Sequence, residues 1–256
     1  MASAESTLPT HGDTPAPTES EPLLGRPGDA TQRPNSPMIY NLFLGTGKLA
    51  QAGALLLLVI IWASVFTNPT LPLVSPHPLL QSLGVYTVIQ AILILQPTNT
   101  PETKLLGQRA HFLLHILSVS LFIAGTTIIE VNKATNHLAH FHSPHAYLGV
   151  ITLALLVLQY LFGFTIWAVP AIYGGEDAAK RLWKYHRWVG YAALLLLLVT
   201  VAAAVETDYT KSVLHIRLWL VIVAEVLILL GVFPRVHLRK LGLKAPAAAA
   251  TAPSSS

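Results

Sequence analysis

Six long apolar segments alternate with shorter polar segments between residues 49 and 233. Each apolar segment is at least 19 residues long, and at about 1.5 Å of rise per residue this spans a hydrocarbon core of ~30 Å. The apolar residues run continuously and do not alternate in twos, which predicts membrane-spanning helices rather than the strands of a barrel. The predicted spans are residues 49–67, 77–96, 109–131, 145–169, 186–205 and 213–233.

The composition agrees with a multi-pass membrane protein. Hydrophobic residues make up 53% of the chain and charged residues only 11%, a balance that few soluble domains show. The net charge of +4 is small, so we expect membrane lipid and no nucleic acid among the partners. The chain has no cysteine, which excludes disulfides, iron–sulfur clusters and thiolate metal ligands.

Both ends of the chain differ from the apolar middle. Residues 1–37 are rich in Pro, Ser, Thr, Gly and acidic residues, and residues 241–256 include the low-complexity run APAAAATAPSSS. We therefore predict two disordered cytosolic tails around one membrane domain at residues 38–240. The sequence ESEPLL at residues 19–24 is similar to the acidic dileucine sorting signals of vacuolar and lysosomal membrane proteins.

The distribution of lysine and arginine predicts the orientation. One side of the membrane receives Lys104, Arg109, Lys180, Arg181, Lys184, Arg187, Arg235, Arg239, Lys240 and Lys244. The other side receives only Lys133, Lys211 and Arg217. Because cytosolic loops carry the excess of positive charge, we expect both termini in the cytosol.

Four histidines begin four consecutive predicted spans. His77, His111 and His145 follow one another at equal steps (111 − 77 = 34 and 145 − 111 = 34), and His186 comes next. Successive helices run in opposite directions, so His77 and His145 share the lumenal or extracellular face, whereas His111 and His186 share the cytosolic face. Histidines within membrane spans generally face the protein interior. Two imidazoles per site are the axial ligands that a six-coordinate haem iron needs.

The motifs around these histidines resemble the eukaryotic cytochrome b561 family. They are HPLLQSLG at residues 77–84, HFLLH at 111–115, SPHAYLG at 143–149 and HRWVG at 186–190. The resemblance implies an all-α integral membrane protein with six transmembrane helices, of which spans 2–5 form a four-helix dihaem bundle. It also implies two haem b groups, one ligated by His77 and His145 and the other by His111 and His186.

The same resemblance implies a transmembrane oxidoreductase that passes electrons from cytosolic ascorbate to monodehydroascorbate or a ferric chelate across the membrane. Lys104 and Arg109 are the candidate donor-binding residues, and Lys133, His137 and His140 are the candidates on the acceptor side. The sequence departs from ascorbate-binding members, because Leu105, Leu106 and Gly107 separate the two cations before His111. We expect a vacuolar or endosomal membrane, with the plasma membrane as the alternative, and we also consider a homodimer.

Several alternatives stay open at this point. His115 and His142 lie close to two of the proposed ligands, although the family pattern favours His111 and His145. Gly84, Gly149 and Gly190 follow three ligand histidines by one to two helical turns, which suits a flat macrocycle but equally suits close helix packing. The histidines as a set would also suit a metal-ion or proton transporter, although transporter sites usually lie near mid-membrane on broken helices. A third alternative is a structural membrane anchor.

Overall fold

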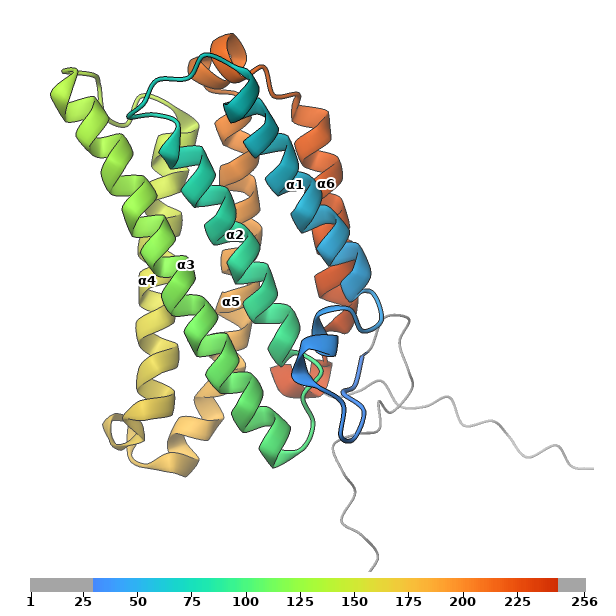
Figure 1. The fold of residues 1–256 in the computed structure, drawn as a ribbon. Helices are drawn as coiled ribbons and strands as arrows, with labels where there is room; N and C mark the ends of the chain where they lie inside the picture. The colour runs from blue at the N-terminus through green and yellow to red at the C-terminus, as the bar shows by residue number, and fades with distance from the viewer. Residues whose placement is uncertain (1–29, 244–256) are drawn as a thin grey trace, which may run out of the picture.

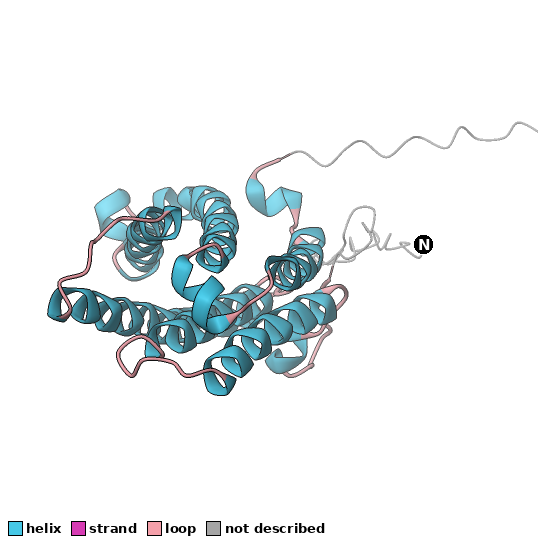
Figure 2. Cartoon of the chain, turned by 90° about the horizontal axis from the view of Figure 1, so that it is seen from above, coloured by secondary structure: helices cyan, strands magenta, loops and turns pink. Residues whose placement is uncertain are grey.

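The computed structural model describes residues 30–243, and these residues form helices joined by loops (Figures 1 and 2). Six helices are long and apolar enough to cross a membrane, and the described residues contain no strand. The prediction of an all-α, multi-pass membrane protein is confirmed. The six helices are α1 (Gly47–Thr67), α2 (Pro76–Leu95), α3 (Pro101–Thr135), α4 (Pro144–Ala168), α5 (Glu176–Val205) and α6 (Leu218–Val232).

The helices run alternately up and down and pack as three pairs. α2 packs mainly on α3, α4 on α5, and α1 on α6. Residues 30–46 and the residues after α6 lie together at the lower end of the bundle in Figure 1, which we call the terminal face. The other end, which carries the loops α1–α2, α3–α4 and α5–α6, is called the opposite face.

Proline and hydroxyl residues define where the helices begin. Thr100 accepts a hydrogen bond from the backbone N–H of Thr103 and forms a capping box before Pro101. Ser143 accepts from the backbone N–H of Ala146 in the same way before Pro144. A proline at the first helical position costs no hydrogen bond, because that N–H has no partner within the helix. These caps define the first residues of α3 and α4, and so they also set the positions of His111 and His145 near those helix starts.

α1 and α6 are held together by small residues. A Cβ atom on Gly231 would lie 2.2 Å from the backbone nitrogen of Ala50, and one on Gly53 would lie 2.5 Å from the carbonyl oxygen of Ala224. Small residues allow membrane helices to approach this closely. Large side chains such as Leu158, Trp219 and Phe66 remain 64–69% exposed on the outer surface, as lipid contact requires.

The helix ends differ from the prediction in three places. α3 begins at residue 101 instead of 109, and α5 begins at 176 instead of 186, because their first turns are polar and extend past the apolar spans. α6 begins at residue 218 instead of 213, because a π-helical turn, η3 (Thr210–Leu214), and a left-handed residue, His215 with φ of 54°, interrupt the chain. Polar first turns and a local π turn leave no signature in an average of hydrophobicity.

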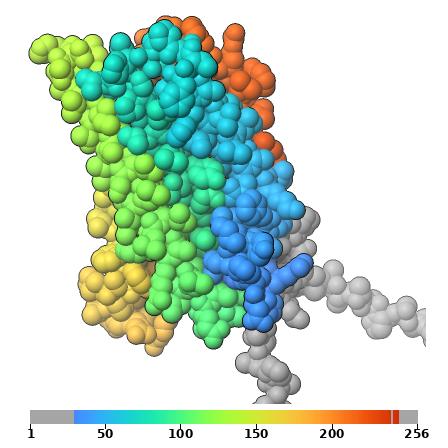
Figure 3. Space-filling view, in the orientation of Figure 1, coloured from blue at the N-terminus to red at the C-terminus, as the bar shows by residue number. Residues whose placement is uncertain are grey.

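The described residues include a few on either side of the predicted domain of residues 38–240. The Gln32 N–H donates to the carbonyl oxygen of Pro97 at 2.9 Å, and the Asn41 side chain donates to Gln32 Oε1 at 3.0 Å. Figure 3 shows this N-terminal segment packed against the lower ends of α2 and α3. Leu241 is also buried. Residues 30–37 and 241, which the sequence analysis places in the tails, thus contact the helical bundle. Residues 1–29, which include the dileucine motif, and 244–256 lie outside the described residues.

Candidate functional site

The four histidines of the sequence pattern form two pairs in the structure. His77 on α2 faces His145 on α4 near the opposite face, with ring centroids 6.2 Å apart. His111 on α3 faces His186 on α5 nearer the terminal face, with ring centroids 6.4 Å apart. Each pair joins the α2–α3 hairpin to the α4–α5 hairpin, across a boundary where the hairpins touch little.

Backbone carbonyls orient three of the four rings. The Nδ1–H of His77 donates to the carbonyl oxygen of Gly125 at 2.9 Å, and that of His111 donates to the carbonyl oxygen of Ala91 at 2.8 Å. The Nδ1–H of His145 donates to the carbonyl oxygen of Thr200 at 2.9 Å. A carbonyl can only accept, so Nδ1 carries the proton and Nε2 keeps its lone pair. The hydrogen bond at Nδ1 fixes both the tautomer and the ring direction, as it does for metal-ligating histidines generally.

The space between the paired rings fits one metal ion held from both sides. Metal–imidazole bonds of ~2 Å from each ring match centroids that lie 6.2 and 6.4 Å apart. Within residues 30–243 no group of three or more His, Asp or Glu side chains could hold a metal ion, so the pair is the ligand set that these residues offer. Beside His145, a Cβ atom on Gly149 would meet nothing within 4 Å, which leaves room for a flat group on that helix.

A large cavity surrounds the pair nearer the terminal face. Its volume is about 930 Å³, and apolar and aromatic side chains such as Phe112, Trp167 and Leu194 form much of its wall. Seven cations also line it: Lys104, Lys180, Arg181, Lys184, Arg187, Arg235 and Lys240. An apolar pocket with a cationic mouth suits a largely hydrophobic ligand that carries negative charge.

The two predicted donor-side residues separate in the structure. Lys104 lines the cavity, whereas Arg109 is exposed and is not among the residues that line it. The helix explains this, because Arg109 lies two residues before His111 and so about 200° around the helix axis from it. Arg109 therefore lies on a different side of α3 from His111.

The neighbouring histidine His115 packs against His111 rather than opposite it. Their ring centroids lie 4.3 Å apart, which is too close for a metal held between them by two bonds of ~2 Å. His115 also contacts the ring of Tyr160 at 4.9 Å, and the Tyr160 hydroxyl lies 3.1 Å from Ser118 Oγ. His115 belongs to a polar cluster at the inner end of the cavity.

On the opposite face, two of the three predicted acceptor-side residues converge on a carboxylate that the sequence analysis did not single out as a site residue. Glu130 pairs with Lys133 at 3.3 Å and with His140 Nδ1 at 2.6 Å. His137 is exposed, with a positive φ of 50°. The signal for Glu130 was its place one turn before Lys133 on the same helix face. His142 is exposed in the loop, and its Nδ1 donates to the carbonyl of Ala139.

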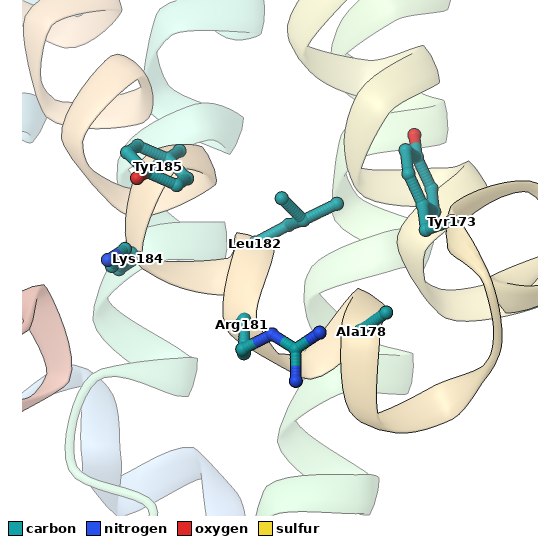
Figure 4. Close-up of a pocket in the computed structure, with 6 residues that line it drawn as sticks. All are labelled: Tyr173, Ala178, Arg181, Leu182, Lys184 and Tyr185. Carbon is teal, nitrogen blue, oxygen red and sulfur yellow. The ribbon is translucent and has the colours of Figure 1, made fainter.

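A second, smaller pocket lies beside the first turns of α5. Figure 4 shows Tyr173, from the turn η2 (Pro170–Tyr173), across from Arg181 and Leu182 of α5. Its volume is about 420 Å³, and the Lys184 ammonium lies 4.8 Å from the centre of the Tyr185 ring. Arg181 and Lys184 line both pockets, so the two pockets share cationic residues.

Six membrane helices with two facing histidine pairs, both presented between the same two hairpins, are the arrangement that the sequence analysis expects of a membrane cytochrome. A comparison with protein families agrees: residues 76–213, from the start of α2 to η3, match the model for eukaryotic cytochrome b561. The match covers more than half of the chain, and the chain belongs to this family. The family membership that the histidine motifs suggested is confirmed.

Several curated relatives are similar to part of the chain at low identity. A lysosomal membrane ascorbate-dependent ferrireductase of Rattus norvegicus is 24% identical over 132 residues, 51% of each chain. Transmembrane ascorbate ferrireductase 1 of Arabidopsis thaliana is 22% identical, over 55% of this chain and 60% of its own. Ascorbate-specific transmembrane electron transporter 2 of Zea mays is 27% identical, over 58% and 65%. The matched part of the chain thus spans between half and two thirds of these relatives.

Proposed function

We propose that this protein carries electrons across a membrane through two b-type haems, from cytosolic ascorbate to monodehydroascorbate or a ferric chelate on the far side. The observation that carries the proposal is the presence of two histidine pairs, one towards each end of the bundle. The names of the relatives support it, because they describe ascorbate-dependent ferrireductases and an ascorbate-specific electron transporter. When bound, haem supplies the one-electron redox chemistry.

The chain contributes the ligands, their orientation and a dry interior. In this proposal His77 and His145 hold one haem, and His111 and His186 hold the other. The carbonyls of Gly125, Ala91 and Thr200 keep three of these rings aligned. Two sites divide a crossing of ~30 Å into shorter steps.

Charge at the terminal face supports an anionic donor. The cations of the cavity mouth, among them Lys104, Lys184 and Arg187, raise the local concentration of a small anion such as ascorbate. The positive-inside rule places this face in the cytosol. Of the two donor-side candidates, Lys104 takes the direct role, and Arg109 contributes a more distant charge. Lys133 and His140, with His137 in the same loop, form the acceptor side.

Purified protein tests the proposal directly. A redox difference spectrum should show low-spin b-type haem, and extraction into acidified acetone should give two haems per chain. In vesicles loaded with ascorbate, an external ferric chelate should be reduced only when the protein is present. One haem per chain would contradict the dihaem assignment. A preparation without a Soret band would instead favour a histidine-dependent metal-ion or proton transporter.

The dileucine at residues 23–24 gives a separate proposal for location, in a vacuolar or endosomal membrane. In the orientation proposed above it faces the cytosol, where sorting adaptors bind such motifs. Changing both leucines to alanine should move a tagged protein to the cell surface. An unchanged distribution would show that the motif has no sorting role.

A further inference from the structure

The two hairpins of the bundle present their histidines with the same spacing. On α2 and α3, each histidine lies fourteen residues before the carbonyl that its helix offers to the histidine of the other helix (91 − 77 = 14 and 125 − 111 = 14). On α5, Thr200, whose carbonyl accepts from His145, also lies fourteen residues after His186 (200 − 186 = 14). The same spacing on α4 (145 + 14 = 159) makes the carbonyl of Gln159 the expected partner of His186.

That fourth hydrogen bond is not formed. Within residues 30–243, nothing forms a hydrogen bond with the buried Nδ1 of His186. The Gln159 side chain instead donates its amide N–H to the backbone carbonyl oxygen of His186, at 2.5 Å. The ring of His186 is therefore the one among the four that no carbonyl orients.

Packing and the flanking backbone hold His186 in place. Its ring lies against Gly163, where an added Cβ would come within 2.6 Å of Cε1, and edge-on to Trp183 at 5.5 Å. The next two residues are tied to the chain beyond α6. Arg187 Nη1 donates to the carbonyl oxygen of Lys240 at 2.6 Å, and Trp188 Nε1 donates to that of Leu241 at 3.3 Å.

Residues 235–242, which we call the C-terminal strap, are in turn fixed to the end of α2. Arg235 is fully buried, and its Nη2 donates to the carbonyl oxygens of Leu93 and Asn41 at 3.1 and 2.7 Å. Lys240 Nζ donates to those of Gln96 and Thr98 at 3.2 and 2.8 Å. Both cations satisfy carbonyls at the negative end of a helix, where positive charge is favourable.

The strap also forms part of the wall of the large cavity. Residues 235–237 and 240–242 line it together with His111 and His186. The strap thus joins the end of α2 to the part of α5 that carries His186, across one side of the cavity. It lies outside residues 76–213, over which the chain matches its family.

We propose that the C-terminal strap is a positioning element for His186 and a cover for the terminal-face cavity. The cofactor held by His111 and His186 then depends on residues beyond α6, whereas the one held by His77 and His145 does not. This inference rests on the proposed function. The dependence arises because the Nδ1 of His186 has no hydrogen bond. The direction of its ring is then set by packing and by the adjacent residues Arg187 and Trp188, which the strap anchors.

Two truncations of the full chain test the inference. A chain that ends at Val236 keeps Arg235 and loses the rest of the strap, whereas a chain that ends at Lys244 keeps the strap and is the matched control. The first should release haem from the His111/His186 site to apomyoglobin about tenfold faster, as expected from losing hydrogen bonds that hold a ligand. Its electron paramagnetic resonance spectrum should change in one of the two low-spin signals. The control should match the full chain in both measurements.

A second variant avoids truncation altogether. Arg187→Leu with Trp188→Phe removes both side-chain donors to the strap, and it should reproduce the selective change. Arg187→Lys with native Trp188 keeps a donor at each position and should restore most of the wild-type behaviour. Unchanged release and spectra in both the short chain and the double variant would overturn the inference, and so would equal loss at both sites. Absence of haem from the full chain would instead contradict the proposed function.

Discussion

The ring of His115 stands edge-on to the ring of His111, with their centroids 4.3 Å apart, one helical turn along α3. This contact decides between two histidines that the sequence places on one face of the helix. His111 faces His186 and donates its Nδ1–H to Ala91, whereas His115 contacts Tyr160. His111→Ala should therefore lose the terminal-face haem, and His115→Ala should keep both haems. Haem content per chain measures the difference, and loss of a haem from His115→Ala alone would reverse the assignment.

On the opposite face, the corresponding choice is between His145 and His142. His145 faces His77 and is oriented by Thr200, whereas His142 is exposed and bonded within its own loop. We expect His145→Ala and His77→Ala each to remove the same haem, leaving about half of the total. His142→Ala should keep the full content, and a loss there with retention in His145→Ala would show that the ligand is His142.

Two glycines on α4 give a matched pair of substitutions. A Cβ at Gly163 would lie 2.6 Å from His186 Cε1, whereas one at Gly149 would meet no protein atom within 4 Å. Gly163→Ala should therefore displace the His186 ring and weaken haem binding at that site about tenfold or more, without changing the other haem. Gly149→Ala should disturb only the His77/His145 haem, if a macrocycle occupies that open space. A spectrum of each variant resolves the two signals, and identical spectra for both would contradict this geometry.

Donor binding should depend more on Lys104 than on Arg109. Lys104 lines the cavity, whereas Arg109 is exposed away from it. Lys104→Ala should slow reduction by ascorbate several-fold, and Arg109→Ala should have a smaller effect, with both haems retained. Because exposed charges are screened over ~8–10 Å at physiological salt, the wild-type rate should fall as salt rises. Stopped-flow reduction at several salt concentrations measures both effects. A larger loss of rate in Arg109→Ala would place donor binding at the exposed surface around Arg109 instead of in the cavity.

The acceptor side should depend on the pair formed by Glu130 and His140. His140 Nδ1 lies 2.6 Å from Glu130 Oε2, and Lys133 pairs with the other carboxylate oxygen. His140→Ala should slow reduction of an external ferric chelate in ascorbate-loaded vesicles several-fold, while internal ascorbate still reduces both haems. His142→Ala is the control on the same loop, because its Nδ1 bonds only within that loop. A larger effect of the control would place the acceptor elsewhere in that loop.

Much of the architecture follows from residue patterns. Continuous apolar runs predict the six helices, and equal histidine steps predict which rings meet, because a membrane of fixed thickness makes alternate helix starts fall on one face. The family resemblance supplied the same pairs. The partners of the histidines could not be predicted, since Gly125, Ala91 and Thr200 act through backbone carbonyls. Every residue has such a carbonyl, so only the packed helices select these three.

The C-terminal strap shows where pattern analysis fails. Its sequence, RVHLRKLG, is short and basic and follows the last apolar span, so the pattern predicts one part in the membrane domain and one part in the tail. The structure buries Arg235 and Leu241 instead. A buried arginine whose Nη2 donates to backbone carbonyls leaves no acidic partner in the sequence to reveal it. In the orientation prediction, the same basic residues contribute only as positive charges in a cytosolic tail.

The reciprocal bonds of His77 with α3 and His111 with α2 also restrict how this chain can change in length over evolution. One residue inserted into either helix between its histidine and the carbonyl it offers would shift everything beyond it by about 1.5 Å and turn it by about 100°. At least one histidine ring would then lose its carbonyl partner. An insertion near the middle of a helix would thus disturb a cofactor site at one end of the bundle. Insertions and deletions should therefore accumulate in the loops and tails of related chains, while the fourteen-residue intervals in α2 and α3 stay constant.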